Sequence, residues 1–258
     1  MSNSNEKFLL AVDIGNTNIV CGFFKGKRLF MKLRLPTDSA DFNIYCRIKN
    51  RLKAAGIKPE SIGLAVISSV VPSASRRLIG LLKKYFNIKS LELGKDAAVP
   101  IKNLYKKPLQ VGQDRLVNAY ACLKLYGKPA IIVDFGTATT FDYINNKGAY
   151  CGGLITPGAE ISLDGLYNKT ALLPKIKLKK PKGLIGKDTA ESMRSGILHG
   201  FSSMCDGIIE KVKEKFTANI TVVATGGLSP LFAPYCKQLD YIDIDLTLKG
   251  IYLVSKKI

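Results

Sequence analysis

Tryptophan is absent from this chain of 258 residues, and histidine occurs once, at His199. The six cysteines form no C-x-x-C pair and no Cys/His cluster of zinc spacing, which favours reduced thiols over a metal or redox site. His199 lies in an apolar helical pattern typical of a packed structural residue. With a single histidine, acid–base chemistry is expected to fall to carboxylates.

No apolar run approaches the ~18 to 20 residues that a membrane-spanning helix needs, so no membrane partner is expected. Residues 1–7 lack the basic start, apolar stretch and small-residue cleavage site of a secretory signal. An apolar fraction of 47% and a mean hydropathy of +0.09 indicate a globular chain. A cytoplasmic protein is therefore predicted.

Acidic residues are scarce, since 20 Asp and Glu stand against 39 Lys and Arg and give a formal net charge of +19. Such a charge attracts polyanions, including nucleic acids. The lysines, however, are spread along the chain and are not interleaved with aromatic residues. The densest run, 175–183, alternates with apolar residues and ends in Pro-Lys-Gly, which predicts a solvated loop or edge strand. A nucleic-acid partner is not expected.

The motif that organises the chain is Asp134–Thr140, with the sequence DFGTATT, which follows the apolar run 129–133. An aspartate at a strand end, then a glycine turn and hydroxyl residues, brings a carboxylate, backbone amides and hydroxyl donors together. These groups suit a nucleotide phosphate and its cation. Turn chemistry alone explains one such motif. A second copy at Asp13–Asn18 and the turn Thr225-Gly226-Gly227 after another apolar run favour the functional interpretation.

The pattern around these motifs predicts a mixed α/β fold in two similar halves, 1–111 and 112–258. The first half reads β-β-β-α-β-α-β, with residues 37–39 expected to cap a helix over about 40–55. The second half repeats the opening hairpin, and a long helix begins near 187–192. An irregular Pro- and Lys-rich stretch, 94–111, joins the two.

Asp114 and Arg115 stand at the start of the helix predicted over 116–123. At that position their side chains can face a cleft, while the amides of the first turn offer donors to an anion. The alternative is a helix cap with a surface ion pair. No P-loop, G-x-G-x-x-G, G-x-S-x-G, H-E-x-x-H or H-R-D signature occurs, which argues against P-loop ATPases, Rossmann dehydrogenases and protein kinases.

Taken in order, the motifs resemble those of the type III pantothenate kinases: DIGNTN at 13–18, GQDR at 112–115, DFGTATT at 134–140, Gly152-Gly153 to Pro157-Gly158, and ATGG at 224–227. The resemblance implies a duplicated ribonuclease H-like fold of the acetate kinase, sugar kinase and actin superfamily, with ATP in a central cleft. It implies a homodimer that phosphorylates pantothenate in the first step of coenzyme A synthesis, using magnesium and a monovalent cation, potassium or ammonium.

The resemblance also assigns roles to residues. It implies that Asp114 is the general base and that Asp134 binds the monovalent cation. The ATP phosphates are implied to contact Asp13, Ile14, Gly15, Asn16, Thr17, Asn18, Ile19, Val20 and Thr137. Pantothenate is implied to contact Tyr105, Gly112, Gln113, Asp114, Arg115 and Thr189, the last across the dimer. Two positions depart from the family pattern, namely Gln113 in place of alanine and Lys107-Pro108 in place of Asn-Pro.

Three alternatives stay open at the level of sequence. A sugar or small-acid kinase of the same superfamily would normally need a longer chain. A non-catalytic regulatory or nucleic-acid-binding protein on this fold would agree with the charge of +19. Such a protein could have lost Asp13, Asp114 or Asp134, so the presence of all three argues against it. A ribonuclease H-like nuclease would need a cluster of acidic metal ligands, which the low Asp and Glu content fits poorly.

Overall fold

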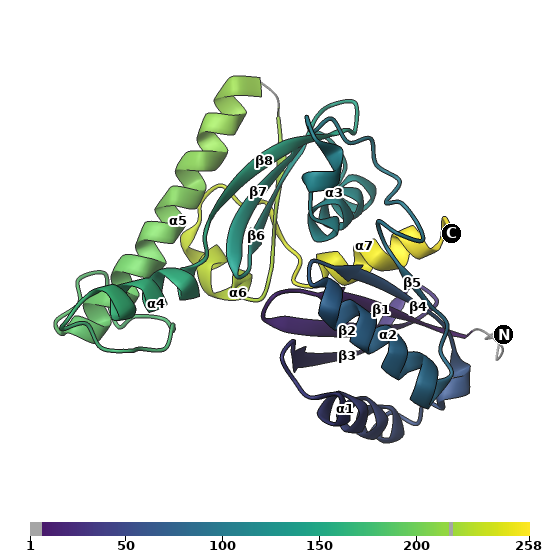
Figure 1. Cartoon of the computed structure of the whole chain (residues 1–258). Helices are drawn as coiled ribbons and strands as arrows, with labels where there is room; N and C mark the ends of the chain where they lie inside the picture. The colour runs from purple at the N-terminus through teal and green to yellow at the C-terminus, as the bar shows by residue number, and fades with distance from the viewer. Residues whose placement is uncertain (1–6, 217–218) are drawn as a thin grey trace. The chain divides into compact units, whose positions relative to one another are not determined.

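The computed structural model describes residues 7–216 and 219–258 and contains two five-stranded sheets with helices packed on them (Figure 1). By its contacts the chain divides into two compact units. The first comprises the described residues up to Ile101, with Lys107–Ala121 and Thr247–Ile258, and the second comprises Lys102–Lys106 and Cys122–Leu246. The halves 1–111 and 112–258 follow the sequence repeat rather than these contacts, and they remain a prediction.

The first sheet has the strand order β3-β2-β1-β4-β5. Its first three strands form an antiparallel meander, and the last two run parallel to β1, each after a helix. The elements are β1 (Phe8–Ile14), β2 (Asn18–Lys25), β3 (Arg28–Pro36), α1 (Asp41–Ala54), η1 (Pro59–Ser61), β4 (Ile62–Ser69), α2 (Pro72–Phe86) and β5 (Ser90–Glu92).

The second sheet repeats this order as β8-β7-β6-β9-β10, with the same antiparallel and parallel pairings. Its strands are β6 (Ala130–Phe135), β7 (Ala138–Ile144), β8 (Tyr150–Pro157), β9 (Thr221–Thr225) and β10 (Tyr241–Ile242). The other elements are η2 (Pro108–Gln110), α3 (Gln113–Leu125), α4 (Ala159–Lys169), α5 (Thr189–Phe216), α6 (Ser229–Phe232), η3 (Ala233–Tyr235) and α7 (Leu246–Ser255). The prediction of a duplicated α/β fold is confirmed.

Each unit has its own hydrophobic core, formed where an apolar helix face packs on an apolar sheet face. In the first unit, Ile44, Ile48 and Leu52 recur every four residues on α1 and are all buried with alternate residues of β1. In the second unit, Ile131, Val133 and Phe135 of β6 pack with residues of α4 and α5. Asp13 and Asp134 are the next-to-last residues of β1 and β6. Because side chains alternate along a strand, both aspartates lie on the face opposite to these cores.

Three predictions about single features have clear outcomes. The capping prediction was wrong, because the N-cap of α1 is Ala40, without any side-chain hydrogen bond. The run 175–183 is a loop without strand structure. His199 is packed edge-on against Tyr235 with ring centroids 5.3 Å apart, as expected of a packed residue.

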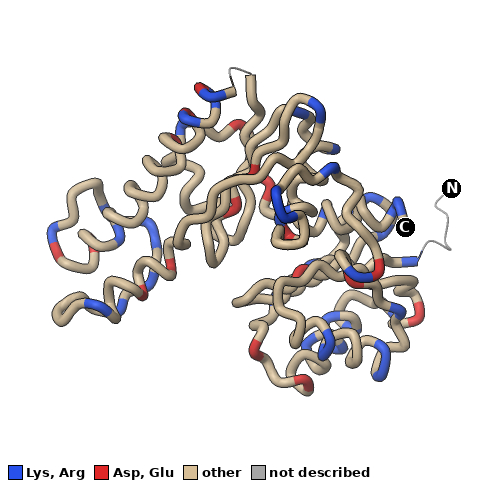
Figure 2. Tube along the Cα trace, turned by 45° about the horizontal axis from the view of Figure 1, so that its top comes forward, with Lys and Arg blue, Asp and Glu red and all other residues tan. Residues whose placement is uncertain are grey.

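The described cysteines are all free thiols, as expected. Among residues 7–216 and 219–258, no helix is both long and apolar enough to cross a bilayer. Residues 1–6, on which the secretory-signal prediction largely rests, lie outside the described part. Figure 2 shows Lys and Arg dispersed along the chain in each unit, without a single continuous stripe.

Candidate active site

The first glycine turn is held rigidly at the end of β1. Asp13 is paired in register with Val20 of β2 and Ser68 of β4, and the Gly15 N–H donates to the Asn18 carbonyl over 2.9 Å. The side chains of Ile14 and Ile19 are fully buried, so these two residues can contact a ligand only through their backbone. Asn16 and Thr17 are exposed. The turn therefore offers amides and polar side chains on a fixed frame, which suits a phosphate group.

Thr37, at the end of β3, fixes this turn from the side. Its hydroxyl donates to the Gly15 carbonyl over 2.7 Å, and its N–H donates to the Thr17 carbonyl over 3.0 Å. Sequence analysis assigned Thr37 to the cap of α1 and missed this contact. The only local signal was a hydroxyl residue just beyond the strand end at Pro36.

Asp114 lies in the first turn of α3, against the backbone of Gly112. A Cβ atom at Gly112 would overlap Asp114 Oδ1 and lie 3.5 Å from Val70 Cγ1, so a side chain there would displace the carboxylate from its present position. The carboxylate accepts the Arg115 N–H over 2.9 Å. Burial raises the pKa of Asp114, and the hydrogen bond and charge of Arg115 oppose that rise only in part. A carboxylate of raised pKa is a stronger proton acceptor, as a general base requires.

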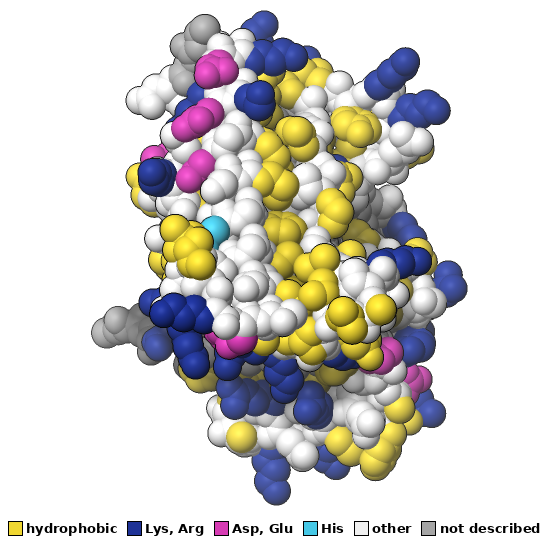
Figure 3. Space-filling model, turned by 90° about the vertical axis from the view of Figure 1, so that its left-hand side faces the viewer, with side chains coloured by type: hydrophobic (Ala, Val, Ile, Leu, Met, Phe, Trp, Pro, Cys, Tyr) yellow, Lys and Arg dark blue, Asp and Glu magenta, His cyan; other side chains and the backbone are white. Residues whose placement is uncertain are grey.

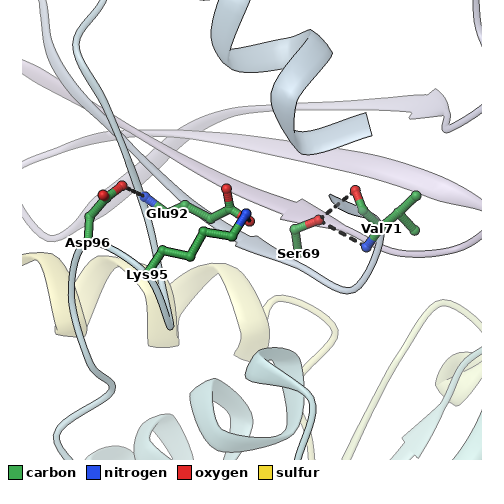
Figure 4. A network of polar contacts seen from close by, with 5 residues as sticks. All are labelled: Ser69, Val71, Glu92, Lys95 and Asp96. Atoms are coloured by element: carbon green, nitrogen blue, oxygen red, sulfur yellow. Dashed lines mark hydrogen bonds and ion pairs between the residues drawn. The ribbon is translucent and has the colours of Figure 1, made fainter. Parts of the chain in front are cut away.

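Two neighbouring turns support this region in the first unit (Figure 4). Ser69 Oγ donates to the Val71 carbonyl over 3.2 Å and accepts the Val71 N–H over 3.1 Å, while the intervening Val70 N–H donates to the Ile14 carbonyl over 3.0 Å. These bonds tie the end of β4 both to the turn after β1 and, through the Val70 side chain, to Gly112. Val70 thus contacts both predicted ligand-binding stretches of the first unit, the turn at Asp13–Asn18 and the segment Gly112–Arg115.

The second turn in Figure 4 follows β5 and carries Gly94. Asp96 accepts the Glu92 N–H over 2.8 Å, and Lys95 Nζ forms an ion pair with Glu92 Oε1, also over 2.8 Å. Gly94 has a φ of +85°, and the Gln113 side chain lies directly against its Cα: a Cβ there would come within 2.7 Å of Gln113 Cδ. The absence of a side chain at Gly94 therefore leaves the space that the Gln113 side chain occupies, a contact that the sequence does not predict.

Asp134 occupies the same position in the second sheet as Asp13 in the first. It pairs with Thr140 of β7 and Thr225 of β9, just as Asp13 pairs with Val20 and Ser68. The Asp134 carboxylate is enclosed by glycine backbone, since a Cβ at Gly226 would overlap Oδ1 and one at Gly136 would lie 3.3 Å from it. Gly226 has a φ of +89°, where side chains are disfavoured.

This arrangement bears on the kind of cation that the second unit can hold. In the described part of the chain, no three His, Cys, Asp or Glu side chains come together as a metal-binding group. The Asp134 carboxylate, enclosed by the turns at Gly136 and Gly226, offers one charge beside neutral backbone oxygens. That donor set fits a weakly held, hard cation better than a transition metal.

Thr137 is exposed at the turn between β6 and β7. The backbone of this turn packs against Gly158, where a Cβ would overlap the Thr137 carbonyl and lie 2.6 Å from the Gly136 carbonyl. Packing therefore explains the glycine at position 158, the last residue of the Gly152 to Gly158 motif. The packing holds the Thr137 hydroxyl in a fixed turn, as a phosphate contact requires.

The remaining two predicted substrate residues lie at different places in the second unit. The Tyr105 ring packs on Gly152, which has a φ of +112°, and a Cβ there would lie 3.3 Å from the ring. Thr189 is the exposed first residue of α5, next to Asp188, whose carboxylate accepts the Glu191 N–H over 2.8 Å. Within the described residues, no hydrogen bond joins Thr189 to Tyr105.

The duplicated strand order, with an aspartate and a glycine turn at the end of the first strand of each sheet, defines an α/β protein of the actin and sugar kinase class. Solved structures agree on the fold. A candidate Baf family transcriptional activator from Campylobacter jejuni has a TM-score of 0.58 at 20% identity, covering 96% of this chain and 98% of its own. A candidate N-acetylglucosamine kinase from Porphyromonas gingivalis has a TM-score of 0.52 at 11% identity, covering 97% and 100%.

Sequence comparison is more specific than the fold. The family model for type III pantothenate kinase matches residues 9–211. Type III pantothenate kinases from Bacillus cytotoxicus and Halalkalibacterium halodurans are 41% and 40% identical over 251 residues, which is 96% of this chain and 96% and 99% of theirs. The chain belongs to the type III pantothenate kinase family, and it is an enzyme.

Proposed function

We propose that this enzyme transfers the γ-phosphate of ATP to the primary hydroxyl of pantothenate, giving 4'-phosphopantothenate, with Asp114 as the general base. The observation that carries the proposal is the Asp114 carboxylate, held against Gly112 at the start of α3 with a raised pKa. Phosphoryl transfer to an alcohol needs positioning, charge neutralisation and a late proton acceptor. Asp114 takes the hydroxyl proton as the new P–O bond forms and ADP leaves.

The other residues divide into two sets in this proposal. The turn from Asp13 to Asn18 and the hydroxyl of Thr137 bind the ATP phosphates, because they present amides and hydroxyls from fixed turns. Pantothenate contacts Tyr105 and the segment Gly112–Arg115, where the guanidinium of Arg115 suits its carboxylate. Because Gly112 and Gly152 have no side chains, Asp114 and Tyr105 pack directly against the backbone at these two positions.

The cations are assigned by donor chemistry. Asp134 would hold a monovalent cation, potassium or ammonium, in the glycine turns around it. Magnesium would be held chiefly by the ATP phosphates, with Asp13 as the nearest protein carboxylate of the first turn. Such cations neutralise phosphate charge, and the residues named here position them.

A homodimer in the cytoplasm completes the proposal. The second unit exposes large apolar side chains on β8 and α4, including Ile155 at 63%, Ile161 at 47% and Tyr167 at 43%. Figure 3 shows hydrophobic side chains gathered in a band on the side of the molecule where α4 and α5 lie. Apolar surface of this kind marks protein contacts. Thr189 at the start of α5 would reach the pantothenate of the partner subunit.

The test is release of ADP by the purified protein with ATP and magnesium, with and without pantothenate, in potassium and in sodium buffers. We expect release that requires pantothenate and is greater in potassium. If ADP is released at the same rate with and without pantothenate, pantothenate is not the phosphate acceptor. If the rates in potassium and sodium are equal, Asp134 does not bind an activating potassium ion. No release at all, with tight salt-sensitive binding of RNA, would favour the non-catalytic alternative.

A further inference from the structure

Two thiols that the phosphoryl transfer does not use meet in the second unit. Cys205 lies on α5 and is fully buried, whereas Cys236 directly follows η3 and is partly exposed. Cys236 packs on the apolar cluster that contains Cys205, and its Sγ lies 4.0 Å from the carbonyl of Ser202, which stands three residues before Cys205 on α5. Cys236 Sγ also lies 3.5 Å from the Phe232 carbonyl. A partly exposed thiol beside a buried one resembles the arrangement of an attacking and a resolving cysteine.

The segment after Cys236 is fastened to α5 by polar contacts on one helix face. The Asp206 carboxylate accepts the Lys237 N–H over 2.9 Å and the Gln238 N–H over 3.0 Å. The Gln238 side chain then bonds to Glu210 over 3.0 Å and to Lys213 over 2.8 Å. Residues 206, 210 and 213 follow one another on the same face of α5. These bonds hold the segment that begins at Cys236 beside the turn of α5 that carries Cys205.

The environments of the two thiols give them different reactivity. The hydrogen bond from Cys205 lowers the pKa of Cys236, although burial and the nearby Asp206 oppose this. The same hydrogen bond, with burial, raises the pKa of Cys205. Cys21 and Cys122, which are buried without such a partner, have pKa values raised to about 12. Because Cys236 is also the partly exposed thiol of the pair, whereas Cys205 is fully buried, peroxide meets Cys236 first.

We propose that Cys236 and Cys205 form a peroxide-reactive dithiol, which closes to an intramolecular disulfide between α5 and the end of η3. The Cys236 thiolate attacks one oxygen of hydrogen peroxide, giving the sulfenic acid and hydroxide. The Cys205 thiol then attacks the sulfenic sulfur, so that the S–S bond forms and one water leaves. The dithiol is oxidised by two electrons, and the peroxide is reduced to two waters overall.

The disulfide would close a loop that contains β9 and the Gly226 turn. Phe232, whose carbonyl lies by Cys236, stacks on Phe135 with ring centroids 5.3 Å apart, and Phe135 directly follows Asp134. Because a cross-link restricts the unfolded chain, oxidation should stabilise the second unit, with a rise in Tm of ~3 to 8 °C. The proposal concerns thiol chemistry alone and does not depend on the proposed phosphoryl transfer.

The test uses the reduced full chain and a few equivalents of hydrogen peroxide, with samples alkylated at timed intervals and measured by intact mass and peptide mapping. We expect the loss of two thiols and two hydrogens per chain, a peptide cross-linked between Cys205 and Cys236, and full reversal by dithiothreitol. The Cys236→Ser variant should lose thiols at least ~10-fold more slowly. In Cys205→Ala, a sulfenic acid should be trapped at Cys236 by dimedone.

The matched controls are Cys46→Ser and Cys151→Ser, since both thiols are partly exposed like Cys236. Neither change should alter the fast reaction. Any of three results would overturn the proposal: Cys46 or Cys151 reacts before Cys236, the disulfide forms between two chains, or Cys236 is oxidised stepwise without a cross-link. Mapping of the unmutated chain decides the question even if the Cys205→Ala variant does not fold.

Discussion

The Thr37 hydroxyl donates a 2.7 Å hydrogen bond to the carbonyl of Gly15. The two residues are 22 positions apart, and Thr37 is buried, with 8% of its surface exposed. The bond joins the residue that follows β3 to the turn after β1, across the intervening β2. The geometry of the first phosphate-binding turn therefore depends on a side chain that does not itself belong to the turn.

Replacing Thr37 by Val should weaken ATP binding while leaving pantothenate binding intact. Valine keeps the shape but removes the donor, so the Gly15 carbonyl loses a partner and the turn loosens. We expect the KM for ATP to rise about 5- to 10-fold and Tm to fall by about 2 to 4 °C. Thr37→Ser, which keeps the hydroxyl, is the control. An unchanged KM for ATP in the valine variant would contradict this role.

Replacing Asp114 by Asn should abolish turnover without unfolding the protein. We expect kcat to fall by on the order of 10²- to 10⁴-fold, with ATP still bound. Because burial raises the pKa of Asp114 in the folded state, the free energy of unfolding falls as pH rises from the ordinary aspartate value through the raised pKa, and the loss is complete above it. The Asn variant should therefore have a higher Tm than the unmutated enzyme at pH 7. Asp164→Asn, on the exposed side of α4, is the control and should change neither quantity.

The same shift predicts how activity depends on pH. Asp114 accepts a proton only when it is ionised, so kcat should fall as pH decreases through its raised pKa. The acid limb should lie above the ordinary aspartate value of about 3.9. In the Asp114→Asn variant the residual rate should lose this limb. The stability gain of the variant should shrink as pH falls from the raised pKa towards the ordinary aspartate value, and it should be absent below that value, where the carboxyl is neutral in both the folded and the unfolded state. An acid limb retained in the variant would assign it to another group.

Replacing Gly226 by Ala should damage the cation site in particular. The φ of +89° and the overlap with Asp134 Oδ1 both disfavour a side chain, and the backbone strain alone costs about 1 to 3 kcal/mol. We expect the potassium concentration for half-maximal activity to rise and kcat to fall at least ~10-fold. Gly165→Ala in α4 has open space and is the matched control. Equal potassium dependence in both variants would show that Gly226 does not shape the site.

The parts of the structure that sequence analysis predicted are those encoded locally. Continuous apolar runs predict the strands, and the repeated Asp-x-Gly turns at Asp13 and Asp134 reveal the duplication. Contacts between distant residues were missed. Thr37 was interpreted as a helix cap because hydroxyl and acidic residues precede α1, but its tertiary partner, Gly15, prevails. The meeting of Cys205 and Cys236 follows no spacing rule and appears only when α5 and η3 are packed together.

Gly94 and Gln113 are the clearest of these distant pairs, and their coupling can be measured. Gly94→Ala introduces two costs, because its φ of +85° disfavours alanine and the new Cβ meets Gln113 Cδ at 2.7 Å. Gln113→Ala removes the second cost and leaves the first, at about 1 kcal/mol. In a double-mutant cycle, the free energy of unfolding lost through Gly94→Ala should therefore be smaller in the Gln113→Ala background.

The kinetic side of the cycle follows from the same geometry. Displacement of Gln113 by Gly94→Ala should raise the KM for pantothenate several-fold and leave the KM for ATP unchanged, because the turn at Asp13–Asn18 is held by other contacts. Gly56→Ala is the control, since its φ of +67° imposes similar backbone strain in open space. If Gly56→Ala and Gly94→Ala raise the KM for pantothenate equally, general destabilisation is the cause. If only Gly94→Ala does so, Gln113 positions the substrate.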